Sequence, residues 1–265
     1  MKAFEYTRAD DAAEAVQQHG GAEGAAFLAG GLSLVPAMKA GRAAPAALVD
    51  ISRIEGLAEI RVDGDILVIG AGATHAQVAT DATVSQLVPA LNALANGIGH
   101  PQVRHLGTLG GTLATADPVT DWPPALLALR AIVVTDRRDI EAAAFFTGPH
   151  ATALEAGELI TAVRFPRCRQ AAYCKYENPA SRYAMAGAFV ARGAQRVRVA
   201  VTGAATTVHR EPLLEQALTA RFTPDAARDV VLDPSRYIDD VHGDPAYRAQ
   251  LVRTMAARAV EAING

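Results

Sequence analysis

Apolar and polar positions alternate along the chain in short runs, which predicts a mixed α+β fold. Strands are expected at residues 25–28, 46–51, 57–62 and 66–69, and the intervening Asp63-Gly64 is a two-residue hairpin signal. Helices are expected at residues 11–19, 34–40, 74–80, 88–95 and 122–129. Asp10 is the expected cap of the first of these helices.

The pattern changes once, after about Pro166. Candidate strands at residues 171–176, 186–192 and 196–202 suggest a three-stranded antiparallel sheet. Helices are expected at 211–220, 223–231 and 244–263, the last with Leu251, Met255 and Ala259 on one face. We therefore expect a first α+β domain at residues 1–166, built from two lobes, and a smaller α+β domain at residues 167–265.

Composition narrows the class of protein. The chain has 265 residues, of which 50% are hydrophobic and 20% charged, with a formal net charge of −3. This composition suits a packed core and offers no basic surface for nucleic acid. The N-terminus lacks the apolar segment of a secretory signal, and no stretch of roughly 18 apolar residues is present. A cytoplasmic protein without a membrane span is expected.

Two diglycine loops are the strongest chemical signal. Residues 29–33 read Ala-Gly-Gly-Leu-Ser and residues 108–112 read Thr-Leu-Gly-Gly-Thr, so each loop combines crowded main-chain N–H groups with a hydroxyl. Glycine permits positive φ and lets a phosphate approach without meeting a Cβ atom. Free amides at the start of a helix bind anions. The two loops together predict a pyrophosphate site.

Other motifs are weaker or missing. Residues 70–75, Gly-Ala-Gly-Ala-Thr-His, resemble a Rossmann fingerprint but end in His75, and no acidic residue follows at a strand end about 20 positions on. The sequence has no phosphate-loop, zinc-helix or nucleophile-elbow motif. The two cysteines, Cys168 and Cys174, are too few to ligate an iron–sulfur cluster. We predict no metal site and no catalytic side chain.

The second loop belongs to a longer motif that resembles a known family. Residues 98–112 read I-G-H-P-Q-V-R-H-L-G-T-L-G-G-T, and residues 116–124 read A-D-P-V-T-D-W-P-P. They resemble the FAD-binding medium subunit of the molybdenum hydroxylases, the family of xanthine dehydrogenase and carbon monoxide dehydrogenase. Its usual pattern is I-G-D-P-Q-V-R-N-x-G-T-I-G-G followed by Asn or Ser and then D-P-x-x-D. Residues 153–160, 247–248 and 258–260 extend the resemblance over nearly the whole chain.

The resemblance implies a FAD-binding PCMH-type domain at residues 1–166 and a carbon monoxide dehydrogenase flavoprotein-like domain at 167–265. This sequence departs from the family pattern at Leu32, His100, His105 and Thr112. Thr112 keeps a hydroxyl. The two histidines are expected to alter the polar surroundings of the flavin.

The resemblance also implies which residues contact FAD. Main-chain groups of both loops are expected to hold the pyrophosphate and ribityl chain: Ala29, Gly30, Gly31, Leu32, Ser33, Leu34, Thr108, Gly110, Gly111 and Thr112. Further contacts are expected from Asp121, Asp117, His75 and Ile160, from Lys175 near the isoalloxazine and from Tyr183 over one flavin face. Structural alternatives remain open: a helix cap for Asp121, a surface or helix-start residue for His75, a solvated strand lysine for Lys175 and a core tyrosine for Tyr183.

The function implied is electron transfer. Such a subunit passes electrons from two [2Fe–2S] clusters in a small subunit through FAD to NAD⁺, a quinone or oxygen, while a large subunit holds the molybdenum cofactor. A dimer of heterotrimers is the assembly expected. Three alternatives stay open: a stand-alone FAD-dependent oxidoreductase, a non-catalytic subunit with a degenerate flavin site, and a Rossmann-type NAD-binding module.

Overall fold

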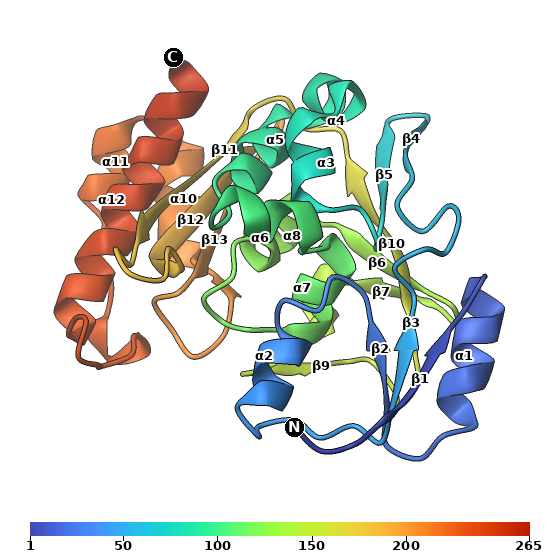
Figure 1. Ribbon diagram of the computed structural model, residues 1–265. Helices are drawn as coiled ribbons and strands as arrows, with labels where there is room; N and C mark the ends of the chain where they lie inside the picture. Colours follow the sequence, from blue (N-terminus) through green and yellow to red (C-terminus); the bar gives the residue numbers. More distant parts are fainter.

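The computed structural model describes residues 1–265 as three larger sheets and a two-stranded ribbon, with helices packed on and between them (Figure 1). The predicted α+β class is confirmed. From the N-terminus the chain builds a small parallel sheet, then a five-stranded sheet, then a four-stranded sheet covered by the C-terminal helices (Figure 1).

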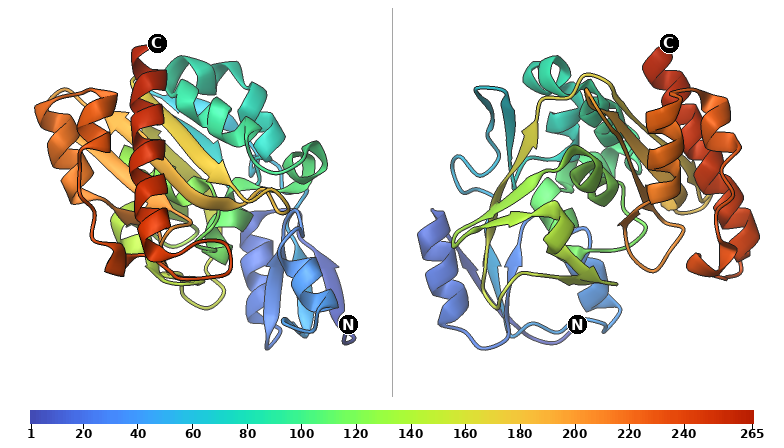
Figure 2. Two further views of the ribbon diagram at one scale, coloured as in Figure 1. Left: turned by 90° about the vertical axis from the view of Figure 1, so that its left-hand side faces the viewer. Right: turned by 180° about the vertical axis from the view of Figure 1, so that it is seen from behind.

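The first lobe is a parallel sheet in the order β1-β3-β2, with its elements at β1 (Glu5–Arg8), α1 (Ala12–Gly20), β2 (Ala25–Leu28), α2 (Leu34–Lys39) and β3 (Ala47–Asp50). Each helix connects two parallel strands, as such connections require. Asp11 caps α1 by accepting from the Glu14 N–H at 2.8 Å, so the cap expected at Asp10 was wrong by one residue. In Figure 2 this lobe stands out from the rest of the molecule.

The second lobe is an antiparallel sheet in the order β4-β5-β10-β6-β7. Its strands are β4 (Ile60–Asp63), β5 (Ile66–Gly70), β6 (Ile132–Thr135), β7 (Asp139–Glu141) and β10 (Ile160–Pro166), and β8 (Phe146–Gly148) and β9 (Ala151–Thr152) form the ribbon. Its helices are α3 (His75–Thr80), α4 (Ala82–Leu87), α5 (Pro89–Asn96), α6 (Pro101–Leu106), α7 (Leu109–Thr115), α8 (Trp122–Leu129) and α9 (Ala142–Phe145). Because β10 pairs between β5 and β6, a late segment closes a sheet begun much earlier.

The strand expected at 57–62 begins only at Ile60. Leu57 lies in a turn, where its carbonyl oxygen accepts from the Gly72 N–H at 2.7 Å. An added Cβ atom on Gly70 would overlap the same carbonyl group. The first two glycines of the Rossmann-like motif therefore let this turn pack on the end of β5. Since β5 runs antiparallel to both its neighbours, the parallel unit that a Rossmann site requires is not formed here.

The C-terminal part is an antiparallel sheet of β11 (Ala171–Glu177), β12 (Ala184–Arg192), β13 (Val197–Thr202) and β14 (His209–Arg210). The fourth strand, only two residues long, was not expected. The helices that follow are α10 (Pro212–Ala220), α11 (Pro224–Arg228), a 3₁₀ turn η1 (Pro234–Arg236) and α12 (Pro245–Asn264). The predicted boundary at 166–167 falls between β10 and β11, which belong to different sheets, and the division into domains stays a prediction.

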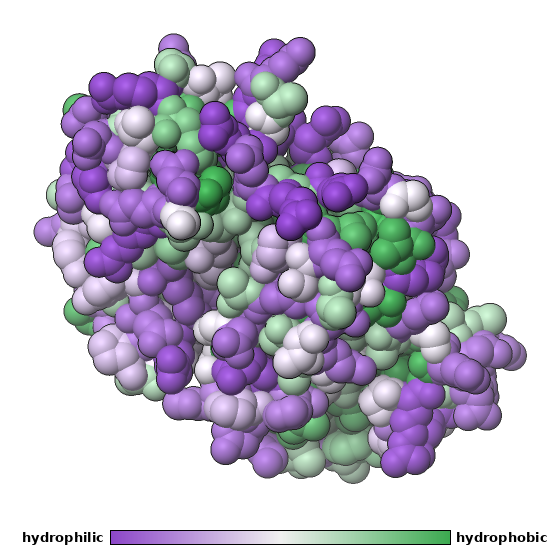
Figure 3. Space-filling view, turned by 90° about the horizontal axis from the view of Figure 1, so that it is seen from above, coloured by the Kyte–Doolittle hydropathy of each residue, from purple (hydrophilic) through white to green (hydrophobic).

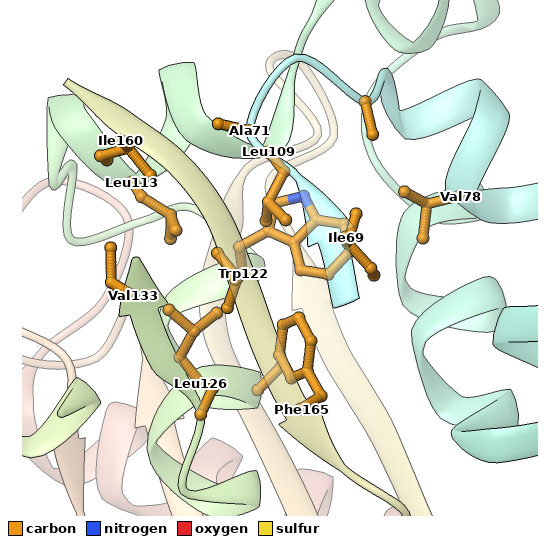
Figure 4. Close-up of a cluster of buried hydrophobic side chains, with 14 of the residues drawn as sticks. Ile69, Ala71, Val78, Leu109, Leu113, Trp122, Leu126, Val133, Ile160 and Phe165 are labelled. Atoms are coloured by element: carbon orange, nitrogen blue, oxygen red, sulfur yellow. The ribbon is translucent and has the colours of Figure 1, made fainter. Parts of the chain in front are cut away.

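Strand β12 explains how the C-terminal sheet joins the rest. Its residues from Ala184 to Ala191 are all buried, because α12 packs on one face of the sheet and α5 and α8 pack on the other. Phe189 and Ala191 point into the large core, whereas Ala188 and Val190 point into the core under α12. The large core centres on Trp122, which packs among Ile69, Leu109, Leu126 and Phe165 (Figure 4).

Hydrophilic residues predominate on the face shown in Figure 3, and the apolar ones there form small patches. In no helix do length and apolar character reach what a membrane crossing needs.

Candidate functional site

A cavity of about 520 Å³ lies where the first lobe, the second lobe and the C-terminal sheet meet. Its size lies within the ~300–1,000 Å³ typical of ligand pockets. The loop after β2, the start of α7, the start of α8, the start of β10 and residues 181–183 all contribute to its wall. The two diglycine loops therefore share one cavity.

The loop after β2 carries unpaired amides. None of the main-chain N–H groups from Ala29 through Leu34 donates a hydrogen bond to the protein, and all these residues line the cavity. Gly31 has a φ of 70°, a conformation that glycine adopts without strain. The loop leads directly into α2, whose cap residue Ser33 makes no side-chain capping bond. Such a run of free N–H groups is a site for an anionic group.

Gly30 brings the two loops into contact. A Cβ atom on Gly30 would overlap the carbonyl group of Leu106 and lie 3.3 Å from the Gly107 nitrogen. Only a glycine permits this approach of one main chain to another. The first loop thus rests on the residues that lead into the second.

The second loop differs from the prediction, because its amides are already used. The N–H groups of Leu109 and Gly110 donate to Ala73 and Ala71, and that of Gly111 donates to the Thr108 hydroxyl at 3.1 Å. Thr108 is the cap of α7. An added Cβ atom on Gly110 would lie 2.7 Å from that of Ala71, so this glycine serves packing. In this loop only the Thr108 N–H is left without a protein partner.

Three carboxylates line the cavity, and two of them are paired. The Glu158 carboxylate, fully buried, binds Arg138, which holds its pKa at about 2. Asp121 accepts from the Tyr173 hydroxyl at 2.6 Å and from the Lys175 ammonium at 3.1 Å. Burial raises the pKa of Asp121, against the opposing effects of Lys175 and Tyr173.

Asp117 is the third carboxylate and the least engaged. Its Oδ1 accepts from the Val119 N–H at 3.1 Å, and its Oδ2 has no partner in the protein. It is therefore available to a ligand donor. Both residues were expected to contact the ligand, and the structure leaves Asp117 the more available of the two. Asp121 occupies the cap position of α8 but makes no capping bond, so the capping role left open for it is not observed.

His75 is the first residue of α3 and is buried. Its Nδ1 accepts from the Trp122 Nε1–H at 3.2 Å, which places the imidazole proton on Nε2. Burial, with a smaller contribution from Arg104, lowers the pKa of His75 to about 4. His75 is thus neutral near pH 7 and supports the wall that it shares with Trp122.

Of the predicted site residues, all but Lys175 line the cavity: Ala29, Gly30, Gly31, Leu32, Ser33, Leu34, His75, Thr108, Gly110, Gly111, Thr112, Asp117, Asp121, Ile160 and Tyr183. The Lys175 ammonium lies behind Asp121 and also donates to the Arg182 carbonyl at 3.1 Å, so its contact with a flavin stays a prediction. Lys175 is 10% exposed, which excludes the solvated alternative. His100 and His105 are exposed and do not line the cavity.

Sequence reasoning missed several wall residues. Most are apolar or small and carry no chemical signal of their own: Phe27, Ile98, Gly99, Val103, Ala114, Leu154 and Leu159. Glu158 and Trp122 stood inside recognised motifs and could have been proposed. Arg182 had no such signal.

The comparisons with known proteins agree with this geometry. Residues 2–168 match the family described as the FAD binding domain in molybdopterin dehydrogenase. The chain belongs to this family. The nicotine 6-hydroxylase medium subunit of Paenarthrobacter nicotinovorans is 34% identical over 90% of this chain and 89% of its own length. The carbon monoxide dehydrogenase medium chain of Hydrogenophaga pseudoflava is 34% identical over 98% of this chain and 96% of its own length.

Solved structures show the same fold over the whole chain. Reconstituted carbon monoxide dehydrogenase from Oligotropha carboxidovorans matches with a TM-score of 0.91 and 31% identity, covering 98% of this chain and 97% of that one. Quinoline 2-oxidoreductase from Pseudomonas putida 86 matches with a TM-score of 0.89 and 28% identity, covering 100% and 99%. The predictions of the family, the fold class, an oxidoreductase and FAD as the cofactor are confirmed.

The close approach at Gly30 predicts a loss of stability in Gly30→Ala. The added methyl group must push the loop away from Leu106, and overpacking of this kind costs about 1–3 kcal/mol. Urea unfolding of the ligand-free chain measures the change. Gly20→Ala is the control, because an added Cβ atom at Gly20 meets nothing within 4 Å. Equal stability of the two variants would contradict the contact.

The buried His75 predicts a pH dependence of stability. Its folded pKa of about 4 lies below the ordinary 6.5, so the unfolded chain binds the proton first as the pH falls. The contribution of His75 to the free energy of unfolding is full above about pH 6.5. It decreases by about 2 kcal/mol between pH 7 and pH 5. His75→Gln keeps an acceptor for Trp122 without the titration. Urea unfolding should show a smaller change between these pH values in the variant; an unchanged slope would refute the assignment.

Proposed function

We propose that this chain is the FAD-carrying electron-transfer subunit of a molybdenum hydroxylase complex. In this assembly it receives electrons from [2Fe–2S] clusters of a small partner subunit and passes them to an external acceptor, NAD⁺ or a quinone. A large partner subunit holds the molybdenum cofactor, and the complex is a dimer of heterotrimers in the cytoplasm. The observation that supports this most is the run of unpaired amides from Ala29 through Leu34 inside a cavity of cofactor size.

The cavity residues fit the parts of FAD. The free amides of the first loop suit the pyrophosphate, because main-chain N–H groups stabilise an anion by donating hydrogen bonds to it. Arg182 is the one Lys or Arg side chain in the cavity wall, and it is paired with Glu177 at 3.3 Å. The free Oδ2 of Asp117 suits a ligand hydroxyl or ring N–H, and Thr112, whose hydroxyl donates to the Thr108 carbonyl at 3.1 Å, keeps oxygen lone pairs for a ligand donor.

When bound, FAD supplies the redox chemistry, and the protein binds, orients and tunes it. The wall offers little else for catalysis. His75 is neutral and hydrogen-bonded, while Asp121 and Glu158 are held in ion pairs. A stand-alone oxidoreductase needs a group that moves a substrate proton, and Asp117 is the one carboxylate in the wall without a cationic partner. Asp117 is thus the one carboxylate that a stand-alone enzyme could use, and the subunit is favoured because relatives that match along nearly the whole chain are named as a medium subunit and a medium chain.

The test is FAD binding by Gly111→Val. Gly111 lines the cavity, and an added Cβ atom there would lie 2.8 Å from the Thr108 hydroxyl, which must rotate and weaken its cap on the Gly111 N–H. The valine side chain should fill ligand space and lower the FAD affinity by about tenfold or more, because overpacking costs about 1–3 kcal/mol and about 1.4 kcal/mol is a factor of ten. Fluorescence titration measures the affinity, and urea unfolding shows whether the ligand-free fold is retained.

Gly20→Val is the matched control and should bind FAD as the wild type does. A wild-type chain that takes up no FAD, alone or with its partner subunits, would refute the flavin assignment. Reduction of the bound flavin by a hydroxylase substrate in the isolated chain would instead favour the stand-alone enzyme.

A further inference from the structure

Residues 178–183, here called the flap, connect β11 to β12 and form part of the cavity wall. Ser181, Arg182 and Tyr183 line the cavity, and Tyr183 is 48% exposed. A residue that is both cavity-lining and half-exposed lies at the mouth. The position of the flap therefore sets how much of the cavity is covered.

The flap has its own hydrogen bonds. The Asn178 N–H donates to the Tyr183 carbonyl and the Arg182 N–H donates to the Asn178 carbonyl, each at 2.8 Å. Arg182 has a φ of 62°, a left-handed conformation that is unfavourable for a residue with a side chain. Such a conformation persists only where the surroundings hold it.

A buried chain of polar groups reaches the flap from behind. Lys175 donates to the Arg182 carbonyl and to Asp121 Oδ2, both at 3.1 Å, and Tyr173 donates to Asp121 Oδ1 at 2.6 Å. The side chains of Lys175 and Asp121 are only 10% and 5% exposed. Charge-assisted hydrogen bonds in such surroundings are stronger than those in water.

Two side chains of one strand and a glycine on the neighbouring strand make this hydrogen-bonded series of polar groups possible. Tyr173 and Lys175 are two residues apart on β11, so both point to the same face of the sheet. Gly187 pairs with Lys175 on β12, and an added Cβ atom there would overlap the Tyr173 hydroxyl. The glycine leaves the space through which Tyr173 reaches Asp121 at the start of α8.

We propose that Tyr173 and Lys175 are positioning residues that act through Asp121 and the Arg182 carbonyl to hold the flap, and with it Tyr183, at the cavity mouth. The other bond from the flap to β11, the ion pair of Arg182 with Glu177, joins two side chains that are about 40% exposed. Exposed pairs contribute little to rigidity. This proposal rests on the proposed function in one respect only, that the ligand which the flap covers is FAD.

Hydrogen–deuterium exchange of the flap amides in the full chain, without FAD, tests the proposal. Tyr173→Phe removes one hydroxyl and keeps the ring that stacks on Phe189. We expect the amides of residue 178 and residues 180–183 to exchange about tenfold faster, as for the loss of one hydrogen bond to a charged group; residue 179 is a proline and has no amide hydrogen. Exchange in β13 should stay as in the wild type, because the effect is local.

Tyr176→Phe is the matched control, since it removes an exposed tyrosine hydroxyl from the same strand. Lys175→Gln should also speed exchange in the flap. Lys175→Arg should exchange at the wild-type rate, because arginine again supplies a cation with hydrogen-bond donors. If Tyr173→Phe does not fold, the two Lys175 variants decide. Wild-type exchange in the flap of both Tyr173→Phe and Lys175→Gln would overturn the proposal.

The FAD affinity gives a second measurement. The loosened flap of Tyr173→Phe should lower it about tenfold, and Tyr176→Phe should leave it unchanged. Failure of the wild type to bind FAD would contradict the proposed function. The exchange experiment, which is done without FAD, would still test whether Tyr173 and Lys175 hold the flap. Faster exchange with an unchanged FAD affinity would show that the flap does not serve the cofactor, and would overturn that part of the proposal.

Discussion

The site depends on one close approach of main chain to main chain, that of Gly30 to the carbonyl group of Leu106. This contact lets the small parallel sheet of the first lobe rest against the segment that leads into α7. With any side chain at position 30 the two loops separate and their shared cavity opens. Gly110 against Ala71 and Gly70 against Leu57 are further close approaches that an added side chain would prevent. Glycines here serve contact between segments at least as much as contact with a ligand.

The two loops, similar in sequence, have different roles. The first keeps its amides free from Ala29 through Leu34, whereas the second uses those of residues 109–112 to bind the end of β5 and its own helix start. Most of the charges around the cavity are likewise used within the protein, because Asp121 is paired with Lys175 and Glu158 is paired with Arg138. What remains for a ligand is a set of main-chain N–H groups and the carboxylate of Asp117. This combination suits a dinucleotide with an anionic bridge and neutral hydroxyl and ring groups.

Local rules predicted many elements because their signals are local. Helix starts near Thr74 and at Trp122-Pro123-Pro124 depend on residues within one turn of the chain. The hairpin between β4 and β5 was also predicted, but its two-residue turn is Gly64-Asp65, because Asp63 still pairs with Ile66, so the predicted turn was wrong by one residue. The prediction was wrong where a distant segment decides. Leu57 leaves the strand pattern because its carbonyl group binds Gly72, and α7 forms because the Leu109 and Gly110 amides find Ala73 and Ala71. Strand β14 exists only by pairing with β13.

The sequence by itself determined the α+β class, the glycine loops, their family resemblance and a set of site residues of which all but Lys175 line the cavity. It did so because glycines, caps and motif spacing are properties of neighbouring positions. Only the tertiary structure decided which amides stay free, which carboxylate is available and where Lys175 points, because each of these depends on a partner far along the chain. Tyr173 on β11 donates to Asp121 at the start of α8, and no local sequence pattern predicts a contact between residues 52 positions apart.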